Sequence, residues 1–100
     1  MKKKKRRPSP NEYRLIYRIN GAEQKSTQYY SGFHSSEALE SLAHAFRKDR
    51  IHGGKLEILE IEERKSFDRG WECRKEEAVE QTKIPELDRE GDRIYFRLSN

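Results

Sequence analysis

Two segments near opposite ends of this 100-residue chain alternate side chains that avoid water with side chains that are mostly charged. In residues 13–19 the apolar set is Tyr13, Leu15, Tyr17 and Ile19, and the other set is Arg14, Ile16 and Arg18. In residues 93–98 the sets are Ile94, Phe96 and Leu98, against Arg93, Tyr95 and Arg97. Because successive side chains of a strand point to opposite faces, both segments predict strands with one buried side and one solvent-facing side.

A helix that covers the buried side is expected over residues 35–50. Ser35 or Ser36 can cap its start, and Glu37 lies in the first turn, where the helix dipole favours an acid. The pair Gly53-Gly54 follows as a stop signal. An apolar stripe at spacings of three and four runs along one side of this segment: Leu39, Leu42, Ala43 and Phe46.

The remaining segments predict shorter elements. Asn20-Gly21 indicates a turn, and β-favouring residues between 25 and 33 indicate a second strand. Residues 55–61 predict a third strand in which the apolar phase slips after residue 58, and either a β-bulge or burial on both faces accounts for the slip. Between there and the last strand we expect a turn in 66–74, a helical stretch at 75–82, an extended piece at 84–87 and a turn at 88–92.

Together these elements predict an α+β fold for residues 12–100, preceded by a disordered basic tail at residues 1–11. The expected order is β-β-α-β, a charged connection with room for a short helix, and a final strand, giving an antiparallel or mixed sheet of about four strands with the helix on one face. Only 32% of the residues are apolar and 40% are charged, but ten are aromatic and each buries a large area. The expected core is Leu15, Tyr17, Leu39, Leu42, Phe46, Ile58, Ile94 and Phe96.

Positive charge is concentrated in the basic tail. The first ten residues contain no acid and six cations: Lys2, Lys3, Lys4, Lys5, Arg6 and Arg7. The rest of the chain has sixteen cations and eighteen acids, and residues 57–92 carry thirteen acids against seven cations. The tail is therefore a candidate for binding nucleic-acid phosphates without sequence specificity. Its alternatives are an anionic membrane surface, a nuclear import signal and a merely solubilising role.

A second nucleic-acid surface follows if the first and last strands share one sheet. The solvent face would then present Tyr95 together with four arginines: Arg14, Arg18, Arg93 and Arg97. Arginine and tyrosine on an open sheet can stack on bases and pair with phosphates. The alternative is an ordinary polar outer face, and residues 93–98 lack the glycines of the RNP1 run of RNA-binding domains.

No residue cluster indicates catalysis, a metal or a cofactor. The three histidines are ten and eight residues apart, which is not the spacing of metal ligands on one helix. Cys73 has no histidine near it in sequence, and the pairs Glu62-Glu63 and Glu76-Glu77 lie among cations, as solvated charges do. The glycine motifs of nucleotide-binding proteins and the Gly-X-Ser-X-Gly motif of hydrolases are absent from the sequence. We therefore expect no enzyme activity.

No apolar run approaches the ~20 residues that span a bilayer. The longest uncharged stretch, residues 26–36, is polar, and no hydrophobic stretch follows the basic tail as it would in a secretory signal. One cysteine cannot form an internal disulfide, so nothing in the sequence calls for an oxidising compartment. These features predict a cytoplasmic protein, or a nuclear one if the host has a nucleus.

Residues 45–60, a helix end followed by Gly-Gly and a strand, resemble that segment of small phycobilisome linker domains. The resemblance covers less than a fifth of the chain and implies only this local order of elements. The function we expect is that of a non-enzymatic accessory or adaptor protein associated with nucleic acid through its tail. The alternative is a protein-interaction or inhibitor module that uses an edge strand or the acidic C-terminal surface to bind another protein or a second copy.

Overall fold

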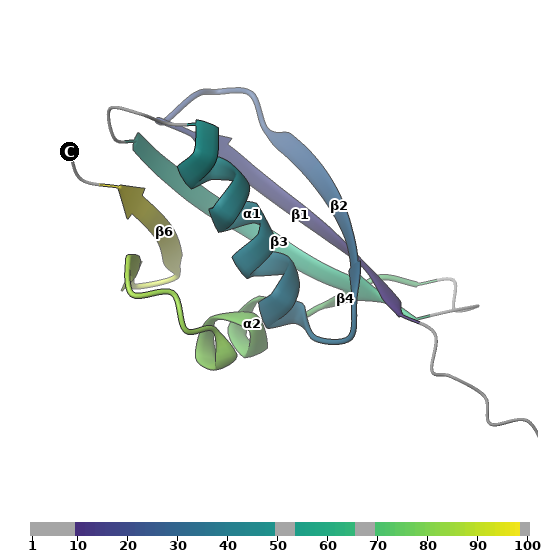
Figure 1. Ribbon diagram of the computed structural model, residues 1–100. Helices are drawn as coiled ribbons and strands as arrows, with labels where there is room; N and C mark the ends of the chain where they lie inside the picture. The colour runs from purple at the N-terminus through teal and green to yellow at the C-terminus, as the bar shows by residue number, and fades with distance from the viewer. Residues whose placement is uncertain (1–9, 50–53, 66–69, 99–100) are drawn as a thin grey trace, which may run out of the picture.

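Six antiparallel strands form one sheet in the computed structural model, which describes residues 10–49, 54–65 and 70–98 (Figure 1). The strands are β1 (Asn11–Ile19), β2 (Ser26–Gly32), β3 (Gly54–Arg64), β4 (Glu72–Cys73), β5 (Leu87–Glu90) and β6 (Arg93–Leu98), and the helices are α1 (Ser35–Asp49) and α2 (Lys75–Gln81). The basic tail from Lys2 to Arg7, the helix stop at Gly53 and the predicted turn around Asp68 lie outside the described residues, as does His52. The predicted α+β class is confirmed.

The strand order in the sheet is β2-β1-β3-β6-β5, and β4 pairs with the end of β3. The first and last predicted strands, β1 and β6, therefore share the sheet but are separated by β3. In the described part of the chain, β2 and β5 are the terminal strands of this order and form its two edges, and the two-residue β4 likewise has one strand neighbour, β3. Helix α1 crosses one face of the sheet, and α2 packs beside the start of α1 (Figure 1).

The prediction of about four strands was too low, because β4 and β5 have no apolar alternation that would announce them. The sequence of β5 is Leu-Asp-Arg-Glu, and it becomes a strand by folding back on β6 through a turn in which Gly91 has a φ of 60°. Only two residues make up β4, which pairs with Glu62 and Glu63 of β3. The expected short helix is present as α2, and β1 begins at Asn11, one residue inside the range predicted as tail.

A β-bulge explains the phase slip in the third strand, one of the two alternatives left open by the sequence. Ile16 pairs with Glu60 and the next residue, Tyr17, pairs with Ile58, so Leu59 has no opposite residue on β1. The bulge turns Ile61 and Glu63 to the face on which Leu56 and Ile58 already lie, because one extra residue inverts the alternation.

The core lies between the helices and the face of the sheet that carries Leu56, Ile58 and Ile61. Of the eight predicted core residues, seven are buried, and Tyr17 packs against the core while remaining half-buried. The rings of Phe46 on α1 and Phe96 on β6 meet edge to face, with centroids 5.8 Å apart. Core residues that the prediction did not include are Tyr13, Ala38, Ala43, Leu56, Ile61 and Ala78.

Candidate functional site

The face of the sheet opposite α1, here called the open face, carries the predicted arginines in two groups. Arg14 and Arg18 project from β1, and Arg93, Tyr95 and Arg97 project from β6, as their alternation predicted. Between the two groups runs β3, which places acids opposite the arginines of β1: Glu62 pairs in register with Arg14, and Glu57 with Arg18. The open face is thus a surface of alternating charge instead of a cationic one.

Arg14 is held by its neighbours on the open face. Its Nε donates to Glu62 Oε1 at 2.8 Å, and its guanidinium lies 4.3 Å from the ring centroid of Trp71. Arg64 lies near the same ring at 4.8 Å and also pairs with Glu12. Because stacking and ion pairing already use this guanidinium, a phosphate would have to compete with Glu62 for it.

Tyr95 lies on the open face but is only 5% exposed. The Nζ of Lys55 sits 3.9 Å from its ring centroid, and Arg93 donates a hydrogen bond to its hydroxyl at 3.4 Å. Arg18 is half-buried, and its Nε has no hydrogen-bond partner among the residues that the structure describes, whereas Arg97 is exposed. The Tyr95 ring is therefore covered on the side that would stack on a base, which weakens the case for base stacking at this surface.

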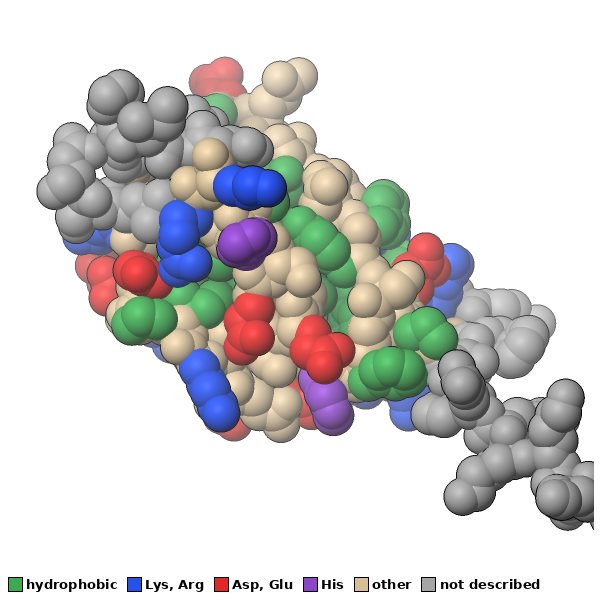
Figure 2. Space-filling model, viewed as in Figure 1, with side chains coloured by type: hydrophobic (Ala, Val, Ile, Leu, Met, Phe, Trp, Pro, Cys, Tyr) green, Lys and Arg blue, Asp and Glu red, His purple; other side chains and the backbone are tan. Residues whose placement is uncertain are grey.

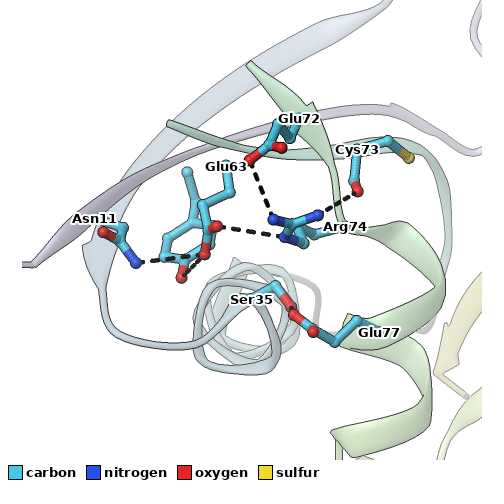
Figure 3. A network of polar contacts seen from close by, with 8 residues as sticks. Asn11, Ser35, Glu63, Glu72, Cys73, Arg74 and Glu77 are labelled. Atoms are coloured by element: carbon cyan, nitrogen blue, oxygen red, sulfur yellow. Dashed lines mark hydrogen bonds and ion pairs between the residues drawn. The ribbon is translucent and has the colours of Figure 1, made fainter. Parts of the chain in front are cut away.

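A buried carboxylate, Glu63, organises the end of β3 on the helix side (Figure 3). Tyr13 donates its hydroxyl proton to Glu63 Oε2 at 2.6 Å, Asn11 donates to the same oxygen at 3.4 Å, and Arg74 Nε donates to Oε1 at 3.3 Å. Arg74 also pairs with Glu72, which anchors β4. The pair Glu62-Glu63 was predicted to be solvated, and for Glu63 that was wrong because the bulge turns it inward. All these groups are paired within the fold, so the network is structural.

Burial raises the pKa of Tyr13 to about 12, and the hydrogen bond to Glu63 adds to the shift. An unfolded tyrosine titrates near pH 10, so the unfolded chain loses this proton first as the pH rises. The contribution that protonated Tyr13 makes to the free energy of unfolding is therefore complete below pH 10 and is lost between pH 10 and about 12. Between pH 8.5 and pH 11 we expect the free energy of unfolding of the native protein, measured in urea, to fall by about 1.4 kcal/mol more than that of Tyr13→Phe. An unchanged difference between the two proteins would contradict this assignment.

The two edges of the sheet differ in length and charge. Strand β2 has seven residues, Ser-Thr-Gln-Tyr-Tyr-Ser-Gly, and none is charged. Strand β5 has four residues, of which Asp88, Arg89 and Glu90 are charged. Soluble proteins protect sheet edges with short strands, charges, prolines or bulges, because unpaired backbone groups there accept further strands. By these criteria β5 is protected and β2 is not.

The exposed large hydrophobic side chains of the described residues also belong to the β2 edge. They are Tyr29, 55% exposed at the middle of β2, and Phe33, 49% exposed directly after it. Tyr29 projects from the open face, with its ring centroid 6.2 Å from that of Trp71. The Glu37 carboxylate accepts hydrogen bonds from the N–H groups of Phe33 and His34, at 2.8 and 3.3 Å. These bonds fasten the end of β2 to the start of α1 and hold Phe33 in place.

A groove of about 150 Å³ opens between β2 and α1 on the helix side. Figure 2 shows hydrophobic side chains in the space between these two elements. The lining is mostly apolar with two tyrosines and one glutamine, and comprises Tyr17, Ile19, Gln28, Tyr30, Leu42, Ala45, Phe46 and Leu56. An enclosed apolar cavity of about this volume accommodates a benzene molecule, so the groove has room for one large side chain. Half-burial of Tyr17, which was predicted to be core, follows from its place in this lining.

Sequence reasoning placed no functional residue on this edge, although one signal was available. In a chain with 40% charged residues, eleven consecutive residues from 26 to 36 carry no charge. The cysteine and the acidic pair at 76–77 that the sequence offered as candidates are surface or structural groups. Cys73 is exposed, Glu76 pairs with Arg89 and Glu77 accepts a hydrogen bond from Ser35 at 3.2 Å. Within the described ranges no group of three or more His, Cys, Asp or Glu side chains is arranged to hold a metal ion.

Comparisons with protein families, with curated proteins and with solved structures return no match, and the resemblance of residues 45–60 to phycobilisome linkers gains no support from them. Among the described residues, no helix is long and apolar enough to cross a membrane. The function is therefore argued from the surfaces described above.

Proposed function

We propose that this protein is a non-enzymatic accessory protein that binds an extended segment of a partner protein by adding it as a strand to β2. The observation that carries the proposal is the difference between the edges: β2 is uncharged, with exposed Tyr29 at its middle and exposed Phe33 directly after it, while β5 is short and charged. In strand addition, backbone hydrogen bonds to the edge supply affinity, and pockets for alternate side chains supply specificity.

The groove beside β2 supplies such a pocket. A strand paired with β2 directs every second side chain to the helix side of the sheet, where the groove lies. With room for about one benzene-sized group, the groove selects an aromatic or large aliphatic side chain. The partner segment is therefore an uncharged strand with a large apolar residue on that side, since a charged residue would be desolvated beside Tyr30 and Phe46 without a counter-ion.

The acidic C-terminal surface supports protein binding less well than β2, because many of its carboxylates already have cationic partners. Within residues 57–92, Glu62 pairs with Arg14, Glu63 with Arg74, Glu76 with Arg89 and Glu86 with Arg47. A basic partner would have to displace these ion pairs. The β2 edge requires no such exchange.

Strand addition is tested by selecting ten-residue peptides from a displayed random library on the full chain, and then methylating backbone nitrogens of a selected peptide. Only alternate N–H groups of an added strand face the edge strand. We expect N-methylation of one alternate set to weaken binding at least about tenfold and methylation of the other set to leave it unchanged. Equal effects of both sets, or amide NMR shifts that map to β5 instead of β2, would refute the proposal.

The groove has a matched pair of variants on α1. Ala45 lines the groove and His44, its exposed neighbour, does not. Ala45→Trp should fill the groove and lower the affinity for the selected peptide at least about fivefold, whereas His44→Trp should leave that affinity unchanged. Equal affinities for the two variants would remove the groove from the binding site and leave the backbone pairing to be judged by the methylated peptides.

Separation of charge supports a second candidate function, association of the basic tail with nucleic acid. Six cations precede residue 8, while the remainder of the chain carries a net charge of −2. We expect generic DNA and RNA to bind the full chain at low salt with a steep dependence on salt, up to a slope of about −5 in log K against log[salt]. A chain lacking residues 1–10 should not bind. Binding that survives this deletion would point to the open face, to be tested with Arg97→Glu, and absence of binding by the full chain would reject this candidate.

A further inference from the structure

We infer that, in the absence of a partner, a second copy of this chain covers β2. The two β2 strands pair antiparallel about a two-fold axis normal to the sheet, so the two sheets become one continuous sheet with both α1 helices on the same side. This inference rests on the proposed role of β2 as the interaction edge and names the occupant of that edge in the free protein.

The absence of charge on β2 makes it complementary to itself. In a two-fold antiparallel pair, opposite residues lie on the same face, and each meets its own copy or a residue two or more places away. A charge at the centre of the seam would therefore meet a like charge. On β2 the open-face residues that meet are Thr27, Tyr29 and Ser31, all neutral. Self-pairing of β5 would instead bring Asp88 and Glu90 against acids of the other copy.

Tyr29 occupies the middle of the strand. When all seven residues of β2 pair with their copies, Tyr29 lies opposite the Tyr29 of the second chain. Aromatic pairs in this position stabilise antiparallel sheets. The contact also removes from water the more exposed of the two large hydrophobic side chains at this edge, and it extends the aromatic contact that Tyr29 already makes with Trp71.

The points at which the two chains enter β1 are compatible with this pairing. Each tail precedes Asn11, which pairs with Gly32 at the end of β2. Antiparallel pairing places the two Gly32 residues at opposite ends of a seven-residue seam, about 20 Å apart at about 3.3 Å per residue. That separation exceeds two Debye lengths at physiological ionic strength, which are about 8 Å each, so charges placed at these two ends of the seam are screened from one another.

A seam of seven paired residues is smaller than the interface of a permanent dimer, so we expect a reversible dimer that a better-fitting partner strand displaces. Sedimentation equilibrium of the full chain over about 1–300 µM should show monomers and dimers in exchange. Tyr29→Lys and Tyr29→Glu should each be monomeric over this range, because each places like charges opposite one another at the centre of the seam. Since Tyr29 is 55% exposed, neither substitution should unfold the chain, which circular dichroism verifies.

Mixing the two variants supplies the decisive measurement. An equimolar mixture of Tyr29→Lys and Tyr29→Glu should form a heterodimer at least as tight as the native dimer, because opposite charges then face each other across the seam. His44→Lys, exposed on α1 and away from the seam, should dimerise like the native chain. A native chain that stays monomeric, dimers that neither Tyr29 variant disrupts, or a mixture without rescue would overturn the inference. None of these results touches the peptide-methylation experiment, which alone decides whether β2 accepts a partner strand.

Discussion

Glu63→Ala is expected to lower the free energy of unfolding by about 3 kcal/mol, measured by urea denaturation at pH 7. The substitution leaves the buried Tyr13 hydroxyl without its acceptor, removes one of the two carboxylates that pair with Arg74, and opens a small void beside them. Removing a buried carboxylate that accepts hydrogen bonds from several neighbours is among the more costly single changes in a folded protein.

The adjacent carboxylate is the control for this prediction. Glu62 makes one ion pair with Arg14, and both side chains are partly open to solvent, at 21% and 29% exposure. Glu62→Ala should therefore cost less than about 1 kcal/mol. Glu63→Gln, which retains an acceptor for Tyr13, should lie between the two. If Glu63→Ala and Glu62→Ala destabilise the protein equally, Glu63 does not hold the network together.

Phe96→Ala is expected to destabilise the protein by about 3–5 kcal/mol, because it empties the centre of the core. The Phe96 ring is fully buried and meets Phe46 on α1 edge to face, so its removal separates the sheet from the helix that covers it. Differential scanning calorimetry and urea denaturation measure the loss directly.

The same substitution at Phe33 is the matched control. Phe33 is 49% exposed, and truncation there should change the free energy of unfolding by no more than about 0.5 kcal/mol. A cost at Phe33 similar to that at Phe96 would mean that Phe33 is packed in the core, and it would remove one support for the β2 edge as an interaction surface.

The two edges of this small sheet differ in their capacity to accept a further strand. New strands are expected on the β2 side and not on the β5 side, because only β2 presents a strand without charges that would be brought against those of an incoming chain. The open face contributes contacts within the fold. Its cations and acids lie in register on neighbouring strands, and Arg14 and Arg64 both lie over the ring of Trp71 near β4.

Several features of the structure were legible in the sequence because they depend on near neighbours along the chain. Alternation at 13–19 and 93–98 predicted β1 and β6 with the correct inward faces, and the stripe from Leu39 to Phe46 predicted α1. Asn20 and Gly21 adopt positive φ angles, as the turn signal required. The phase slip after Ile58 was recognised, and a bulge was one of the two explanations offered.

The surroundings of the candidate site residues escaped prediction because they depend on which strands become neighbours. Arg14 is neutralised by a glutamate 48 positions away, and Tyr95 is covered by Lys55 from the adjacent strand. Nothing local distinguishes a solvent-facing arginine that is free from one that is paired. Similarly, the uncharged run at 26–36 was visible in the sequence, but its importance depends on β2 lying at the edge of the sheet.

By itself the amino-acid sequence determined the layers of this protein: the periodicity of its apolar residues dictates which faces of strands and helix turn away from water, whatever the order of the strands. Only the tertiary structure decided the edge, the groove and the pairing of charges. The physical reason is range, since periodicity acts between residues a few positions apart, whereas β2 is left open, and Glu63 is buried, by contacts between segments tens of residues apart.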